Sequence, residues 1–179
     1  MPFILSSDTD DQGEWFLYGK DTDGKDIRFK VRRLSSSKEY EIERLYTPKK
    51  TELQYRKGNM IIQQDPDVAR AGNIDKASYA LLDSENCAVV PPDRETAGML
   101  AKALGSDEPV IGKPLLLDGK WGRVDDAASP RKLSDRYPVK GLFFSDYMDV
   151  ALRVITKAKK LGIQALEEEE EGKAVSSPS

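Results

Sequence analysis

No histidine occurs among the 179 residues of this chain, and cysteine occurs once, as Cys87. Histidine is the commonest general base and zinc ligand, so its absence excludes Ser-His-Asp and Cys-His catalytic sites. A single cysteine cannot form an internal disulfide, which indicates a reducing compartment, and we expect Cys87 to be a small core residue. An enzyme based on carboxylates or lysines remains possible, but the commonest catalytic groups are missing. We therefore expect no enzymatic activity, no cofactor and no metal.

Long apolar runs are missing as well. No run approaches the roughly 18 residues that span a membrane. The N-terminal MPFILSSDTDDQ has no basic stretch, and its apolar run from Phe3 to Leu5 is too short for a secretory signal. We therefore expect a cytoplasmic protein without a membrane partner.

Charge is plentiful but unevenly distributed. Charged residues make up 33% of the chain and hydrophobic ones 39%, which is enough for a core beneath a highly charged surface. Residues 27–57 hold ten basic residues against four acidic ones, whereas Glu167–Glu171 form an uninterrupted acidic run. Because like charges followed by Gly, Ser and Pro cannot bury enough surface to offset chain entropy, we expect residues 166–179 to be a disordered acidic tail.

Apolar periodicity and turn residues predict an α+β fold, with a hairpin-rich part over residues 1–64 and a mainly helical part over 65–165. EWFLYG (14–19) and IRFKVRRL (27–34) alternate as strands, and Asp23-Gly24 between them favours a hairpin. A helix is predicted from Ser35 to Tyr46, with Ser36 and Glu39 at capping-box spacing. Residues 51–64 predict a second hairpin that turns at 57–59.

Four further helices are predicted: residues 66–84, which Gly72-Asn73 could interrupt, then the segment that follows Pro91-Pro92 and ends at Gly105, then 127–137, and finally 142–161. The last is the most periodic, with Phe143, Tyr147, Val150 and Val154 along one side. Such a stripe is more often core than a groove for a partner. These four residues are nevertheless our candidates for contact with a partner helix.

A row of three cations, Arg28, Lys30 and Arg32, alternates with the apolar residues of its strand. A nucleic-acid surface would need exposed aromatics among the cations, but Phe29 falls on the apolar face. Nucleic acid is therefore an unlikely partner, and we interpret the row as the solvated face of a half-buried sheet. The alternatives are a nucleic-acid surface and a docking site for an acidic protein segment.

Other candidate motifs fail on spacing. DTDGKD, from Asp21, resembles a calcium loop, but glycine comes at position 4 instead of 6 and Arg32 occupies position 12. Turn chemistry explains the segment without a metal. VIGKPLLLDGK contains Gly-Lys but lacks the upstream glycine of a phosphate-binding loop. Trp15 and Trp121 are both predicted to be core residues.

Several short segments occur in an order that resembles a known family. They are EWFLYG, then IRFKVRRLSS with Arg33-Leu34 leading into a helix, YALLDSENC (Tyr79 to Cys87), LLDGKW (Leu116 to Trp121), and Tyr137-Pro138 before a last helix with a charged tail. This order is similar to small proteins encoded in the tail-assembly region of long-tailed, siphophage-type bacteriophages. These proteins are tail assembly chaperones and tail accessory proteins.

The resemblance implies a non-enzymatic protein of the host cytoplasm that binds the tape-measure protein and helps to recruit tail-tube subunits. The helical half would shield a partner helix, the acidic run would add solubility, and self-association is compatible with such a role. The segment VVPPDRETAGMLAKALG departs from the family pattern. A structural component of the virion, such as a minor tail or connector protein, therefore stays an alternative, as does a nucleic-acid accessory protein.

Overall fold

The structure, a computed structural model, describes residues 13–46, 54–56, 59–61, 65–106, 111–122 and 132–175. Its main sheet is antiparallel, in the order β1 (Glu14–Lys20), β2 (Asp26–Val31), β5 (Leu81–Glu85). Two short antiparallel pairs are β3 (Gln54–Arg56) with β4 (Asn59–Ile61), and β6 (Ala88–Val89) with β7 (Leu115–Leu116). The helices are α1 (Ser36–Arg44), α2 (Pro66–Ala80), α3 (Arg94–Leu104), α4 (Leu133–Arg136), α5 (Pro138–Asp146) and α6 (Met148–Val175). The predicted α+β class is confirmed.

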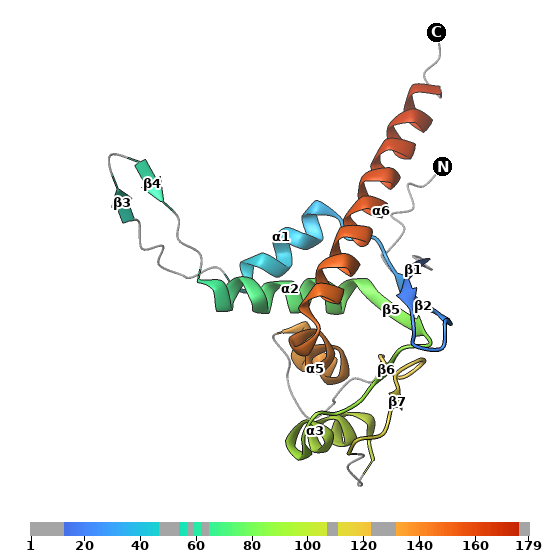
Figure 1. The fold of residues 1–179 in the computed structure, drawn as a ribbon. Helices are drawn as coiled ribbons and strands as arrows, with labels where there is room; N and C mark the ends of the chain where they lie inside the picture. The colour runs from blue at the N-terminus through green and yellow to red at the C-terminus, as the bar shows by residue number, and fades with distance from the viewer. Residues whose placement is uncertain are drawn as a thin grey trace.

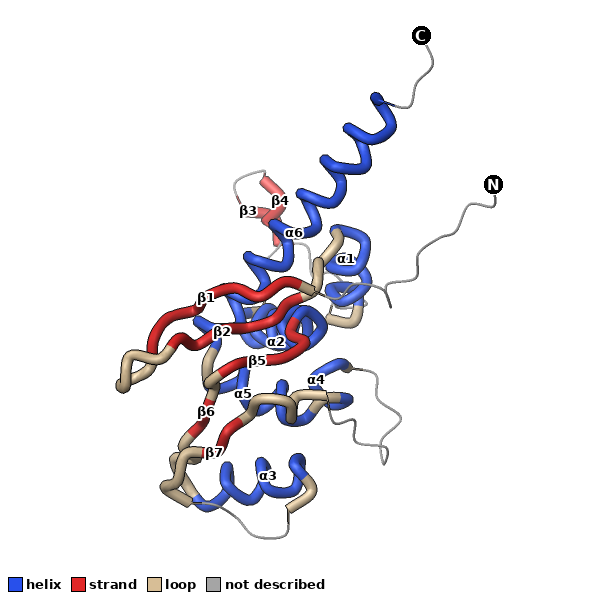
Figure 2. The backbone as a smooth tube through the Cα atoms, turned by 90° about the vertical axis from the view of Figure 1, so that its right-hand side faces the viewer, coloured by secondary structure: helices blue, strands red, loops and turns tan. Residues whose placement is uncertain are grey.

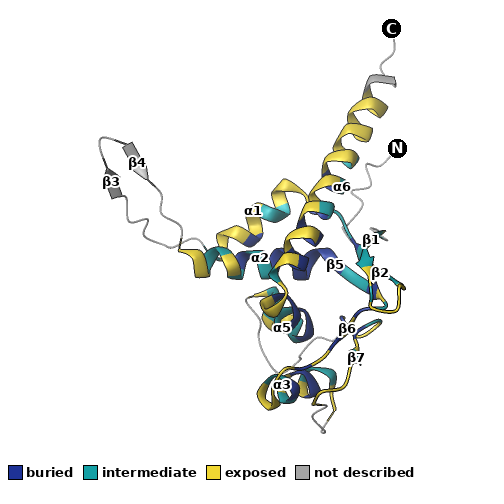
Figure 3. Ribbon diagram, viewed as in Figure 1, coloured by how far each residue is buried: buried dark blue, intermediate teal, exposed yellow. Residues whose placement is uncertain are grey.

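Helix α2 is central, because α1, α4, α5 and α6 all pack against it. Its C-terminal half is buried and leads directly into β5 (Figure 3). Helix α3 and the β6–β7 pair lie at one end of the molecule, and the C-terminal part of α6 projects from the other end (Figure 1 and Figure 2). The α3 region and the C-terminal part of α6 therefore lie far apart, and each could contact a different partner.

The first hairpin forms as predicted. The Asp21 carboxylate accepts hydrogen bonds from the backbone N–H groups of Asp23 (2.9 Å) and Lys25 (2.8 Å), which fixes the turn without a metal. In the turn Gly24 adopts a φ of 79°, which glycine tolerates best. The second predicted hairpin is confirmed in β3 and β4, although its turn at 57–58 lies outside the described residues.

The predicted helix over 66–84 is corrected by the structure. Helix α2 runs through Gly72-Asn73 without interruption, ends at Ala80, and gives way to strand β5 at Leu81. The backbone N–H of Arg32 binds the carbonyl of Ala80 at 2.9 Å, and residues 81–85 pair with β2. Pairing with a strand some fifty residues earlier in the chain overrides the local helical pattern.

Two details of α1 also differ from expectation. Its N-cap is Ser35, one residue before the predicted Ser36, and the Ser35 hydroxyl accepts from the backbone N–H of Lys38 at 3.2 Å. Glu39 makes no capping box but lies 3.3 Å from Lys76 and 2.9 Å from Lys159. These ion pairs, to which Lys159 contributes most, lower the pKa of Glu39 although its partial burial opposes them.

The predicted helix over 142–161 is two helices, α5 and α6, which meet at Tyr147 with φ −118° and ψ 65°. The break lets both helices turn an apolar face toward the core. Helix α6 then continues to Val175 through Glu167–Glu171, where we expected a disordered tail. Glu, Ala and Lys are good helix formers, and the packed first turns have already met the cost of nucleation. Residues 176–179 lie outside the described part.

The short helix α4 ends at Arg136, just before the Tyr137-Pro138 pair, as the sequence indicated; residues 127–131 of that prediction are not among those described. Trp121 is a core residue, only 1% exposed. Trp15 is not, since it is 43% exposed on β1, an edge strand of the sheet. The β1–β2 register places Trp15 opposite Lys30, on the face of the sheet that is turned to solvent.

Candidate functional site

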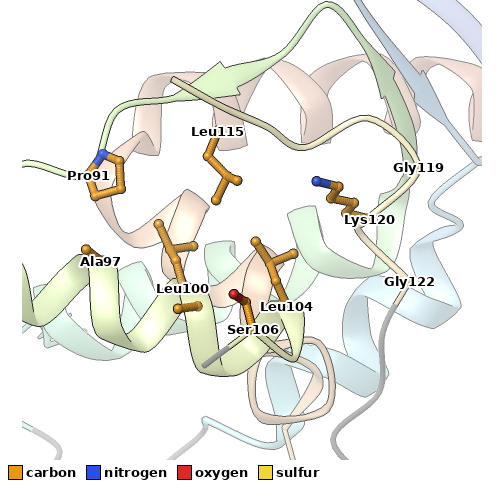
Figure 4. A pocket seen from close by; sticks show the side chains of 10 residues that line it. Pro91, Ala97, Leu100, Leu104, Ser106, Leu115, Gly119, Lys120 and Gly122 are labelled. Atoms are coloured by element: carbon orange, nitrogen blue, oxygen red, sulfur yellow. The ribbon is translucent and has the colours of Figure 1, made fainter. Parts of the chain in front are cut away.

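An apolar hollow of about 480 Å³ lies between α3 and the loop that carries β7 (Figure 4). Its apolar walls are formed by Pro91, Ala97, Leu100, Ala101, Leu104 and Leu115. Ser106, Lys120, Gly119 and Gly122 complete the lining. Volume and lining both fall in the range of protein pockets that hold an apolar ligand or side chain.

Helix α3 is positioned by strong signals at both ends. The Asp93 carboxylate accepts from the backbone N–H of Thr96 at 2.7 Å, a hydrogen bond that lowers the pKa of Asp93. Gly105 ends the helix in the left-handed region at φ 73°, as its place in the sequence predicted. The lining residues of α3 are spaced three and four apart, so they share the helix face that borders the hollow.

The wall opposite α3 is held by a hydrogen-bond cluster around Asp118. One oxygen of this carboxylate accepts from the Ser84 hydroxyl (2.6 Å) and the Cys87 backbone (3.0 Å), and the other accepts from the Asn86 backbone (2.6 Å). We call Ser84, Asn86, Cys87 and Asp118 the Asp118 cluster. Burial, and secondarily the Asp118 charge, raise the pKa of the Cys87 thiol to about 12, so this buried thiol is not a nucleophile at neutral pH.

Trp121 connects this cluster to the helical core. Its indole N–H donates to the Ser84 hydroxyl at 2.8 Å, and its ring meets Phe143 edge-on with 5.0 Å between centroids. The Asp83 carboxylate accepts from the backbone of Gly119 at 2.8 Å, which fixes the turn that presents Lys120. These hydrogen bonds hold the segment that supplies Gly119 and Lys120 to the lining of the hollow.

Lys120 supplies the charge at the hollow. Its amino group points over the apolar lining (Figure 4), and no carboxylate among the described residues lies within ion-pair distance of it. Among the described lining residues Lys120 is the one titratable group, so this part of the lining pairs no acid with a base. The arrangement suits an apolar side chain that is followed by a carboxylate.

Arg28 and Lys30 of the predicted cationic row lie on β2, the central strand, where neighbouring acids compensate them, and Arg32 follows the end of β2. The Arg28 guanidinium is 3.2 Å from Asp26 and 3.9 Å from Glu85, and it is about half exposed. The register also places an acidic residue of β5 opposite Lys30. The row of Arg28, Lys30 and Arg32 is thus part of a mixed-charge face and not a continuous cationic patch.

Arg32 has a structural role of its own. Its Nε donates to the Tyr79 carbonyl at 2.6 Å, and its guanidinium lies 3.7 Å from the centroid of the Tyr79 ring. The register of β1 places Trp15 opposite Lys30, so this exposed aromatic shares the cationic face, which the sequence had not indicated. The acids of β5 on the same face still keep its net charge low.

The candidate partner residues of the last helices lie mainly inside the protein. Phe143, Val150 and Val154 are buried in the core, and only Tyr147, which is 39% exposed, reaches the surface. The structure does not bring them together with the cationic row. A partner would find Tyr147 alone of this set at an exposed position.

Sequence reasoning missed Lys140, which is buried in α5. Its ammonium group donates to the carbonyls of Ser78 (3.0 Å) and Leu81 (2.5 Å), two acceptors left open where α2 ends. Burial, with a smaller contribution from Arg32, lowers the pKa of Lys140 to about 7. No sequence signal marks it, because a lysine in an amphipathic helix normally predicts an exposed position.

We expect Lys140 to make stability depend on pH. The folded state holds this lysine with a pKa of about 7, whereas an unfolded lysine keeps a value near 10.5, so the unfolded state binds more protons between these values. The free energy of unfolding should therefore rise as pH increases from about 7 to about 10.5. Urea unfolding at several pH values would measure this rise.

The pH dependence of Lys140→Met should be compared with that of Lys102→Met, because Lys102 is an exposed lysine of α3. Lys140→Met should remove the extra rise with pH, and Lys102→Met should keep it. Equal pH slopes for the wild type and Lys140→Met would show that burial does not shift this amine.

Within the described part of the chain, no group of three or more acidic or cysteine side chains gathers as a metal site. None of the described helices combines the length and the apolar character that a membrane span requires. Comparison of the chain with protein-family models, with curated proteins and with solved structures finds no match.

Proposed function

We propose that this protein is a non-enzymatic tail assembly chaperone, or a closely related accessory protein, of a long-tailed bacteriophage. In this role it acts in the host cytoplasm, binds an apolar helical segment of the tape-measure protein and helps to recruit tail-tube subunits. The observation that carries the proposal is the apolar hollow beside α3, where Lys120 is the one charged residue among the described lining residues.

The two central segments of the family resemblance support this proposal. Asp118, from LLDGKW, binds Ser84, Asn86 and Cys87, from YALLDSENC. Segments about thirty residues apart in sequence thus form one unit, and Gly119 and Lys120 of that unit line the hollow.

An amphipathic helix is the fitting occupant. Such a helix places an apolar anchor in a groove and keeps its charged residues at the edge. The leucine-lined hollow takes the anchor, and Lys120 lies where an acidic residue of the same helix would reach it. We therefore expect a contact that depends mainly on apolar surface and survives high salt.

Coexpression with the tape-measure protein of the same phage genome tests the proposal. The wild type should keep that protein soluble and copurify with it at low and high salt. Ala101→Leu fills the hollow from α3 and should abolish both effects while leaving the melting temperature unchanged or slightly raised. Met99→Ala, on the exposed outer side of α3, is the matched control and should behave as the wild type.

Two results would contradict the proposal. One is a tape-measure protein that is equally insoluble with and without this chain. The other is normal binding by a correctly folded Ala101→Leu variant, which would move the contact away from the hollow.

A further inference from the structure

The C-terminal part of α6 projects from the body of the protein (Figure 1 and Figure 3). Packing ends near Gly162, where an added Cβ would lie 2.7 Å from the Leu34 carbonyl oxygen. Beyond that point the helix is largely exposed, including Ile163 at 57% and Leu166 at 55%. Two large apolar side chains thus lie in solvent on a helix that nothing in the described structure covers.

This projecting segment is electrostatically unfavourable in a single copy. Glu167–Glu171 place five like charges within two turns, and i,i+3 and i,i+4 repulsion destabilises a helix. Acidic side chains near a helix C-terminus also oppose the helix dipole. An isolated helix of about 12 residues is marginal even with good helix formers. Cations and apolar surface from outside the segment would remove both penalties.

The exposed side of α6 has the spacing of a coiled-coil seam. Alternating steps of four and three residues connect Thr156, Lys159, Ile163, Leu166, Glu170 and Lys173. Such a stripe faces one partner helix. Leu152, also exposed, lies seven residues before Lys159 and extends the same stripe toward the N-terminus.

Charge along α6 divides into two blocks on either side of the exposed apolar pair. Residues 152–160 contain four cations and no acid, and residues 167–171 contain five acids. Two of the cations also pair within the chain, Lys157 with Glu14 at 2.8 Å and Lys159 with Glu39 at 2.9 Å. A second copy of the helix, running antiparallel, places the acidic block of each copy beside the basic block of the other. A parallel copy would place like blocks together and would be repelled.

We propose that two copies of this chain associate through an antiparallel pair of α6 helices, with the two-fold axis between Ile163 and Leu166. In this register Ile163 of one copy packs against Leu166 of the other, and the reverse contact follows by symmetry. Lys159, which also pairs with Glu39 of its own chain, then lies opposite Glu170 of the second copy, and Lys160 lies on the same side of the seam as Glu167 of the second copy. Both ion pairs occur twice in the dimer.

A second copy fits better than an unrelated helix, because one symmetric contact places the acidic block of each copy beside the basic block of the other. The seam has only two apolar layers around the axis, so it is smaller than the interfaces of permanent dimers. We therefore expect a reversible dimer that dissociates on dilution and weakens with salt. The hollow beside α3 lies at the opposite end of the molecule and stays open (Figure 1).

Sedimentation of the full chain from low micromolar to near-millimolar concentration tests the dimer. The wild type should shift from monomer to dimer, and the double variant Ile163→Asp, Leu166→Asp should stay monomeric. The control is Met99→Asp with Leu116→Asp, two apolar residues of similar exposure at the α3 end, which should dimerise as the wild type does. A monomeric wild type at every concentration would overturn the proposal.

Charge reversal tests the antiparallel register. Lys159→Glu with Lys160→Glu makes one variant, and Glu167→Lys with Glu170→Lys makes the other. Each alone faces like charges across the axis and should dimerise more than about tenfold more weakly. Mixed together they should form a heterodimer, because every pair is then opposite in sign. Failure of the mixture to associate, or full dimerisation of either variant alone, would overturn the register.

Discussion

Replacing Asp118 by alanine is expected to lower the free energy of unfolding by about 3–5 kcal/mol, because three donors lose a charged acceptor. These donors are the Ser84 hydroxyl and the backbone N–H groups of Asn86 and Cys87. Asn86 is held at a φ of 61°, an unfavourable conformation for a residue other than glycine, and its N–H bond to Asp118 helps to keep it there. Loss of the carboxylate should therefore loosen the whole wall of the hollow.

Trp121 fluorescence and Cys87 reactivity would show whether the destabilisation arises near Asp118. In a Trp15→Phe background Trp121 is the sole tryptophan, and Asp118→Ala should shift its emission to longer wavelength in the native protein. Cys87, the only cysteine, should react faster with a thiol reagent, since both its burial and its raised pKa depend on an intact wall. Asp146→Ala, at an exposed position of α5, is the control and should change neither signal.

Chemical denaturation would give the free energy itself. A loss below about 1 kcal/mol for Asp118→Ala, with unchanged tryptophan emission, would show that water or another group replaces the carboxylate. In that case the wall would not depend on Asp118.

Removal of the Asp75 carboxylate should be comparably destabilising, again by about 3–5 kcal/mol, since breaking up a buried charged network leaves its donors unpaired. Asp75 is fully buried in α2 and accepts from the Tyr46 hydroxyl (2.5 Å) and from the backbone N–H groups of Leu133 (3.2 Å) and Ser134 (2.9 Å). The last two donors begin α4, which has no cap from its own N-cap residue, Lys132. Asp75 thus caps a helix nearly sixty residues later in the chain.

A double-mutant cycle separates the two functions of Asp75. Tyr46→Phe removes one donor, while burial and Asp75 together raise the pKa of the Tyr46 hydroxyl and keep it protonated. Urea unfolding of Asp75→Ala, Tyr46→Phe and the double variant should give a coupling energy of about 1–2 kcal/mol for this pair. Tyr40→Phe, on the exposed side of α1, should leave stability unchanged. Additive effects of the two variants would contradict the hydrogen bond.

Local features of this fold were accessible from the sequence. The Asp23-Gly24 turn, the alternation of β2, the left-handed Gly105 and the Tyr137-Pro138 boundary each depend on residues within a few positions of one another. Backbone sterics and neighbouring hydrogen bonds determine such features before any distant part of the chain takes part. The absence of histidine from the chain is equally a property of composition, and it excludes histidine-dependent catalysis without reference to structure.

The tertiary structure decided everything that depends on distant partners. Residues 81–84 became strand instead of helix because β2 offered a sheet edge, and Trp15 became exposed because its register places it on the solvent face of the sheet, opposite Lys30. Lys140 became buried because the end of α2 supplied two open carbonyls, and Asp118 became a structural centre because the residues after β7 approach β5. The periodicity of a sequence shows which face of a helix or strand is apolar. Which residues cover that face depends on packing between segments that are tens of residues apart in the chain.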